Sequence, residues 1–508
     1  MDSELVIREN LRVGFIWQRH SFGPYVSVGR LYDNTETALR KSFVVVKYEY
    51  NSGRSIEEER KALRSFLFQT DVILGLNSRL LEVRKEEKIN VPFCFFPLGV
   101  MPKGGSVLFS WRTLLRETDS ILFSSAADRE IFDRMVKNSR IKTYIVPFGV
   151  DCSLFKPIPQ SDNLYTRKRI GIPDNAPLLL YVGRINVQKN IHTLLKMFRE
   201  IVRKEDSARL CLVGQQDDVQ FHEFGLTNEG YDKYLKELID RYNLNRKVIM
   251  TGQLDGGNLV SMYSAADILV NCTIHHDENF GYSQVEAMAC GTPVVCSKWG
   301  GLKDTVVHGE TGFHMDTLMT NNGVKADWSS GVEYILYLLN DKPLLKRMSK
   351  RCVEYARDKF GIEAFTKSLA KVIEDMYTEK RKWNPANMNP AFEFTHSAVN
   401  FHMHRLYVNY LDKTSGGKCR SPMFSGDNYE LYKFIMEPYA SKTVYRMTCI
   451  NDVDIPYFLT DVTFDKNTTT LYVIDPIWPR TYELERWEFS TLSQISFSIS
   501  SVIMISKL

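Results

Sequence analysis

Short apolar runs alternate with helical patterns over the first 160 residues of the chain. Each run has six to nine residues, many of them β-branched or aromatic, and polar segments separate the runs. The runs are RVGFIW, SFVVVKYEY, DVILGL, VPFCFF, SILFSS and TYIVPF. Strands that alternate with amphipathic helices are typical of a parallel sheet with crossover helices. Residues 1–160 are therefore predicted to form one doubly wound α/β domain.

The same pattern starts again after the polar break KPIPQSDN. Its apolar runs are PLLLYVG, ARLCLVG, KVIMTG, DILVNC and TPVVCS. The helix expected after Asn190 carries apolar side chains on one face, namely Ile191, Leu194, Leu195, Phe198 and Val202. This spacing predicts a helix that packs on a sheet. Residues 161–384 are predicted to form a second α/β domain.

The second domain is expected to end in an amphipathic crossover helix, marked by Phe365, Leu369, Val372, Ile373 and Met376. The Pro-rich stretch WNPANMNP follows and is predicted to be a linker. Beyond it, residues 391–508 contain a helical pattern around NYELYKFIMEPY and a strand-like run in TTTLYVIDPI. We predict a small accessory α+β module there, of unknown role.

Composition narrows the class of protein. Of the 508 residues, 44% are hydrophobic and 25% charged, as in ordinary globular proteins. The net charge of +4 is not gathered in a block, so nothing indicates nucleic-acid binding. The nine cysteines include no Cys-x-x-Cys pair, which favours reduced thiols and a cytoplasmic protein. No apolar run is long enough for a transmembrane segment, and we expect none.

Two cations follow the first strand of the second domain. Arg184 comes directly after LLLYVG, and Lys189 stands at the start of the next helix. Ligands of open parallel sheets bind at the carboxyl ends of strands, and helix N-termini favour anions. The pair suits a diphosphate, although two solvated surface bases would give the same spacing.

The segment HHDENFGYSQVEAMACGTPVV gathers polar residues immediately before a helix. Glu278 and Glu286 lie eight positions apart, and Gly281 permits a ligand to approach the main chain. A structural alternative is equally open at this point. Ser283 and Glu286 have the spacing of a capping box, which would make Glu286 a helix cap.

Residues 120 to 315 resemble glycosyltransferase family 4 over most of their length. YVGRINVQKN is similar to the family's Gly-Arg to Lys element, ENFGYSQVE to its Glu-to-Glu motif, and EAMACGTPVVCSKWGG to the helix and strand that follow. GETGF and IVPFGVDCSLFKP also fit the family pattern. The resemblance implies a GT-B fold, in which two Rossmann-like domains face a cleft.

The resemblance also implies an activity: transfer of a hexose from a UDP- or GDP-sugar, with retention of anomeric configuration, onto an unidentified acceptor (glycan, lipid, small molecule or protein). Arg184 and Lys189 would neutralise the donor diphosphate, Glu278 would contact the sugar, and Glu286 would hold the ribose. The remaining donor contacts would come from Gly183, Leu254, Asn279, Phe280, Gly281 and Tyr282. No metal or other cofactor is expected.

The N-terminal half departs from the family pattern. The histidine that the family usually offers after the fourth strand is absent from FCFFPLGVMPKGG. His20, in the loop after the first strand, is a candidate substitute, and Gly23 a candidate for the family's first glycine-rich loop. A lone loop histidine is more often a bystander than a catalytic group.

Other patterns carry less weight. Asp452 and Asp454 imitate a metal-binding Asp-x-Asp element. Three histidines lie close to one another in sequence: His396, His402 and His404. Such short patterns arise often by chance. His275 and His276 are interpreted as surface polarity. Two alternatives to a transferase remain: a nucleotide-sugar epimerase or phosphorylase on the same fold, and a non-catalytic GT-B-like binding protein.

Overall fold

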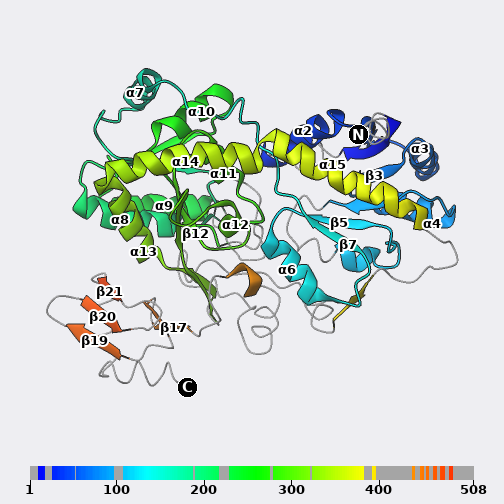
Figure 1. Cartoon of the computed structure of the whole chain (residues 1–508). Coiled ribbons are helices and arrows are strands. Elements are labelled where there is room, and N and C mark those ends of the chain that lie inside the picture. Colours follow the sequence, from blue (N-terminus) through cyan, green and yellow to red (C-terminus); the bar gives the residue numbers. More distant parts are fainter. Residues whose placement is uncertain are drawn as a thin grey trace.

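The computed structural model describes residues 10–17, 26–51, 53–96, 107–186, 189–216, 228–274, 278–320, 323–382, 392–395 and 437–440, with five strands between residues 447 and 483. Two parallel sheets lie side by side in it, each covered by helices (Figure 1). The predicted arrangement of two Rossmann-like domains is confirmed.

The first domain contains a six-stranded sheet in the order β2-β1-β3-β4-β5-β7, with every pair parallel. Its strands are β1 (Arg12–Trp17), β2 (Val44–Glu49), β3 (Val72–Gly75), β4 (Phe93–Phe95), β5 (Ser120–Phe123) and β7 (Lys142–Ile145). The helices between them are α2 (Val26–Arg40), α3 (Ile56–Phe68), α4 (Ser78–Glu86) and α6 (Ala126–Met135). All six predicted runs are strands.

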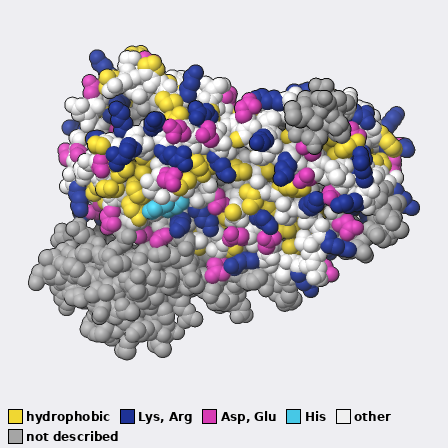
Figure 2. Space-filling view, viewed as in Figure 1, with side chains coloured by type: hydrophobic (Ala, Val, Ile, Leu, Met, Phe, Trp, Pro, Cys, Tyr) yellow, Lys and Arg dark blue, Asp and Glu magenta, His cyan; other side chains and the backbone are white. Residues whose placement is uncertain are grey.

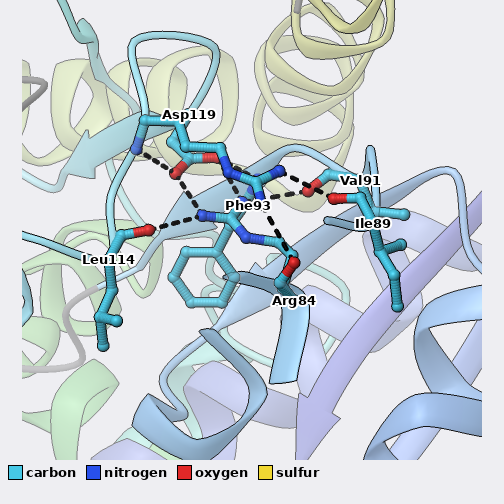
Figure 3. Close-up of polar contacts among 7 residues, drawn as sticks. Arg84, Ile89, Val91, Phe93, Leu114 and Asp119 are labelled. Carbon is cyan, nitrogen blue, oxygen red and sulfur yellow. Dashed lines mark hydrogen bonds and ion pairs between the residues drawn. The ribbon is translucent and has the colours of Figure 1, made fainter. Parts of the chain in front are cut away.

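A buried ion pair links α4 to the residue that precedes β5 (Figure 3). Arg84 on α4 donates to both carboxylate oxygens of Asp119, at 2.6 and 2.8 Å, and neither side chain is exposed. Arg84 also donates to the carbonyls of Val91 and Leu114, while Asp119 accepts from the Phe93 amide. Buried charges are tolerated when they are paired and hydrogen-bonded in this way.

The second domain repeats the architecture with the strand order β10-β9-β8-β11-β12-β13, again all parallel. Its strands are β8 (Leu178–Val182), β9 (Arg209–Val213), β10 (Val248–Gly252), β11 (Ile268–Asn271), β12 (Val294–Ser297) and β13 (Gly312–Met315). The strand order reverses between β8 and β11. Ligands of doubly wound folds bind outside the carboxyl ends of the strands at such a switch point.

The helices of this domain are α7 (Gln160–Arg169), α8 (Ile191–Lys204), α9 (Asn228–Arg241), α10 (Gly256–Ala265), α11 (Tyr282–Ala289), α12 (Leu302–Thr305), α13 (Trp328–Asn340) and α14 (Lys342–Phe360). A hairpin of β14 (Thr317–Thr320) and β15 (Gly323–Ala326) follows β13. The apolar face predicted for α8 packs inward, with Val202 only partly buried.

Helix α15 (Ile362–Glu379) crosses from the second domain to the first (Figure 1). It packs against α2 and β3, and Phe365, Leu369, Val372, Ile373 and Met376 are its buried residues together with Ala370. Tyr144 of the first domain donates a hydrogen bond of 3.2 Å to Asp375 on this helix. Residues 161–384, predicted as one domain, thus end in a helix that belongs by its contacts to the first domain.

The C-terminal part contributes two short contacts to these domains and two small sheets. β16 (Glu393–Phe394) pairs with β6 (Val136–Lys137), and a 3-10 turn covers Glu437–Tyr439. One antiparallel sheet joins β17 (Met447–Ile450) to β18 (Val453–Pro456), and another joins β19 (Asp461–Asp465), β20 (Thr470–Ile474) and β21 (Arg480–Glu483). The strand predicted within TTTLYVIDPI is therefore present.

Among the described residues, no helix combines the length and apolar character that a membrane crossing needs. Acidic and basic side chains are interspersed on the face shown in Figure 2, without an extended patch of one sign. The side chains of seven cysteines are described, and all seven are free.

Candidate functional site

The predicted donor residues gather at the switch point between β8 and β11. Arg184 and Lys189 lie in the loop from β8 to α8, and Glu278 lies in the loop from β11 to α11. Lys189 forms an ion pair with Glu278, although 89 positions separate them in the chain. The side chains are 18% and 10% exposed, so the pair is largely screened from solvent. The structure therefore brings together two residues that were predicted separately.

Glu286 lies on α11, where it is buried and accepts two hydrogen bonds. Tyr263, on α10, donates its hydroxyl to Oε2 at 2.8 Å. Arg30, on α2 of the first domain, forms an ion pair with Oε1. Burial raises the pKa of Glu286 above its ordinary value, while Arg30 and Tyr263 act in the opposite direction. This carboxylate thus connects the two domains.

The capping-box interpretation of Glu286 is wrong. Helix α11 begins at Tyr282, its N-cap is Gly281, and no side chain caps it. Ser283 is therefore inside the first turn and cannot be the capping residue. Gly281 has a φ of 85°, and a Cβ at this position would lie 2.7 Å from Leu302. Both observations explain why a glycine precedes the helix.

The other predicted donor residues border the same loop. Asn279 and Phe280 follow Glu278, and the Tyr282 ring lies parallel to Phe148 of the first domain at 5.9 Å between centroids. Leu254 is partly buried after β10. Gly183 follows β8 and donates its amide to the Val213 carbonyl at 2.9 Å. These positions are consistent with the predicted roles but do not test them.

A second contact ties the first domain to this loop. Ser124, after β5, donates its hydroxyl to the Asn279 carbonyl at 3.1 Å. The amide of Ala127, at the start of α6, donates to the Asp304 carboxylate at 3.1 Å. The loop that carries Glu278 and Asn279, and helix α12 with Asp304, are thus each hydrogen-bonded to the first domain.

Some predicted residues fall outside the described part of the chain. His20 and Gly23 are among them, as are His275 and His276, so their predicted roles stay predictions. The same holds for His396, His402, His404 and Asp452, while Asp454 is described only as part of β18. Within the described ranges, no group of three or more His, Cys, Asp or Glu side chains could hold a metal.

Arg30 is the important residue that the sequence analysis missed. It lies in VSVGRLYDN, a stretch whose pattern shows only an amphipathic helix. Its guanidinium lies 5.3 Å from the centre of the Phe155 ring, in the segment where the chain passes from the first domain to the second. Pairing with Glu286 spans 256 positions and depends on the domain arrangement, so no local signal could reveal it.

Known proteins resemble part of this chain. Residues 163–359 match the family described as Glycosyl transferases group 1. The chain carries a glycosyltransferase group 1 domain. That match contains Arg184, Lys189, Glu278 and Glu286, and it begins near the predicted start of the second domain at residue 161.

Several curated relatives are D-inositol 3-phosphate glycosyltransferases. The protein of Segniliparus rotundus is 31% identical over 199 residues, which are 36% of this chain and 41% of that protein. The protein of Kineococcus radiotolerans is 27% identical over 56% of this chain and 64% of its own length. The chain thus spans about half the length of the curated relatives it matches.

Solved structures resemble the two-domain body. HepE of Anabaena, in complex with UDP and glucose, has a TM-score of 0.55 at 18% identity, covering 72% of this chain and 99% of its own. Sucrose-phosphate synthase of Thermosynechococcus elongatus has a TM-score of 0.54 at 21% identity, with coverages of 72% and 99%. At these identities the likeness establishes the fold.

Proposed function

We propose that the protein is a retaining glycosyltransferase of family 4 that moves a hexose from a UDP- or GDP-sugar to an acceptor still to be identified. The observation that carries the proposal is the convergence of Lys189 with Glu278 at the β8/β11 switch point, with the buried Glu286 on the helix that follows the same loop. A cation, a sugar-binding carboxylate and a ribose-binding carboxylate are the groups that a nucleotide-sugar donor requires. The group 1 domain match supports the same assignment.

In this proposal, Lys189 and Arg184 meet the negative charge of the diphosphate. Before the donor binds, Lys189 is neutralised by Glu278, so a cation is held in place without an unbalanced charge. When the diphosphate takes over Lys189, the Glu278 carboxylate can accept hydrogen bonds from sugar hydroxyls. Charge on the diphosphate grows as its bond to the sugar breaks, and a fixed cation then stabilises the transition state more than the ground state.

Glu286 is proposed to accept hydrogen bonds from the ribose hydroxyls. Tyr263 orients its carboxylate at 2.8 Å, and Arg30 supplies a positive charge from the opposite domain. The ribose and Arg30 both require this carboxylate, so donor binding must rearrange or share the contact. A substitution of Glu286 would consequently also remove a contact between the two domains.

The chemistry is proposed to follow a front-side route, in which the leaving phosphate takes the acceptor proton. Arg184, Lys189 and the N-terminus of α11 are proposed to supply the positive charge, without a metal cofactor. The first domain is proposed to build the acceptor site. A cytoplasmic location is supported by the free cysteines.

A thermal-shift panel of nucleotides and nucleotide sugars is the experiment that tests this proposal. We expect a uridine or guanosine diphosphate, and its sugar, to raise the melting temperature of the wild type. Glu286→Ala should remove that increase, because the ribose hydroxyls lose their acceptor. Arg203→Met, on the exposed end of α8, is the control and should keep it. No stabilisation by any nucleotide would contradict the proposal.

Product analysis then separates the alternatives. With the donor identified, a set of acceptors that includes D-inositol 3-phosphate should yield a glycoside. Formation of an epimeric nucleotide sugar would indicate an epimerase, and release that depends on added phosphate would indicate a phosphorylase. Nucleotide binding without any turnover would favour a binding protein.

A further inference from the structure

The C-terminal segment returns to the junction of the two domains at residues 437–440, the short orange turn between α6 and α12 in Figure 1. On the side of the first domain, Glu437 forms an ion pair of 2.7 Å with Arg134, and Tyr439 donates its hydroxyl to Asp128. On the other side, the Gly300 amide donates to the Tyr439 carbonyl at 3.0 Å. The turn is thus bonded to both domains.

Tyr439 is the centre of this contact. Its side chain is fully buried, and its ring meets the buried ring of Trp299 edge-on, with 5.4 Å between centroids and an angle of 85°. Lys303 adds a hydrogen bond to the Pro438 carbonyl. A buried aromatic pair with a satisfied hydroxyl has a defined position, unlike a loose surface contact.

Only Gly300 and Gly301 lie between Tyr439 and residues 278–281, the loop before α11 that is called the donor loop below. Gly300 has a φ of 50°, and a Cβ on it would lie 2.4 Å from the Glu278 carbonyl and 2.8 Å from the Tyr439 ring. Gly301 donates its amide to the Glu278 carbonyl at 2.8 Å, and a Cβ on it would lie 2.0 Å from the Asn279 carbonyl oxygen. The Tyr439 ring thus packs closely against the Gly300–Gly301 main chain, and this main chain is hydrogen-bonded to the Glu278 carbonyl.

We propose that Tyr439 is a positioning residue for the donor loop, through which the C-terminal segment holds Glu278 in register with Lys189. This inference rests on the proposed function of Glu278 in contacting the sugar. Asp128, the partner of the Tyr439 hydroxyl, lies in the first turn of α6, close in sequence to Ser124, which bonds the Asn279 carbonyl. The same loop is thus held from both domains and from the C-terminal segment.

Full-length Tyr439→Leu tests the proposal by two independent measurements. Hydrogen exchange of the peptide covering 278–289 should become about tenfold faster, because local opening becomes easier. Turnover should fall about a hundredfold, since small displacements of substrate-positioning groups are costly. The nucleoside diphosphate affinity should fall by a smaller factor than turnover, because Glu286 lies farther along α11 and keeps its Tyr263 bond.

Phe392→Leu is the matched control. Phe392 belongs to the same C-terminal segment and is 2% exposed, but it packs on Phe132, with 5.6 Å between ring centroids. It should lower thermal stability while leaving turnover and the 278–289 exchange unchanged. Should Tyr439→Leu fail to fold, Trp299→Phe weakens the same aromatic contact and is measured in the same way.

Unchanged exchange of 278–289 in Tyr439→Leu, or an equal increase in Phe392→Leu, would overturn the proposal. The exchange measurement requires no substrate, so it remains decisive even if the wild type transfers no sugar. Absence of transfer by the wild type would count against the proposed function alone.

Discussion

Arg30 of the first domain forms an ion pair with Glu286 of the group 1 domain, and Glu286 is buried against Tyr263. The pair places a positive charge from one domain on the carboxylate proposed to bind the donor ribose in the other. Donor binding and the contact between the domains therefore depend on one titratable group.

This relationship predicts how nucleotide affinity varies with pH. Burial raises the pKa of Glu286, and Arg30 counteracts the increase. As pH falls through that pKa, the carboxylate gains a proton and ceases to accept from both ribose hydroxyls, so affinity weakens. Arg30→Met removes a lowering influence, and the loss of affinity should begin at a higher pH than in the wild type.

Calorimetric titration of the nucleoside diphosphate over the acidic range checks this order. Glu286→Gln supplies the baseline, because it removes the titrating group and leaves the titration of the ligand. The assigned coupling would be contradicted if the pH at which affinity begins to fall is the same in Arg30→Met as in the wild type, or lower.

Arg184→Met and Lys189→Met should each reduce turnover by about a hundredfold, the usual effect of losing one preorganised charge partner. Substrate affinity should weaken much less, because the charge that these residues meet is greatest when the glycosidic bond breaks. Steady-state kinetics with the identified donor give kcat and KM separately. Arg203→Met, a basic residue at the other end of α8, should behave like the wild type. Unchanged kcat in either variant would mean that the substituted residue is an ordinary surface base.

Arg84→Met should destabilise the first domain by about 3–5 kcal/mol, because Asp119 would be left as a buried charge without its counter-ion. The exposed pair of Arg60 and Glu86 gives the comparison, and Arg60→Met should have little effect on stability, because solvent screens this pair. Denaturant unfolding followed by fluorescence compares the two variants. Equal costs would mean that the buried pair adds nothing beyond a surface contact.

Eleven of the twelve strands in the two parallel sheets could be predicted, because each of them is a short apolar run that needs no distant partner to be recognised; β13 (Gly312–Met315) was not among the predicted runs. Every run predicted in the two α/β domains is a strand, and the apolar face predicted for α8 is buried apart from the partly buried Val202. The convergence of two predicted donor residues could be expected for a related reason. Polar residues that follow strands directly meet at the switch point, so Lys189 and Glu278 converge although they are far apart in sequence.

The contacts between domains could not be predicted in the same way. Arg30 contacts Glu286, and Tyr439 contacts Gly300, only because two domains and a C-terminal segment meet there. Their local sequences show an amphipathic helix and a helical pattern, respectively. The capping-box interpretation failed for a local reason: Gly281, with its positive φ, starts α11 before Ser283 can cap it.

The anomeric configuration of the sugar that is first released from the donor tests the central claim most directly, and proton NMR measures it. Retaining transferases can use water as a slow acceptor, so the wild type with its donor and EDTA should release a sugar in the donor's anomeric configuration before mutarotation. Lys189→Met should release the sugar about a hundredfold more slowly. Release of the opposite anomer, an epimeric nucleotide sugar, or turnover that requires added metal would contradict the account.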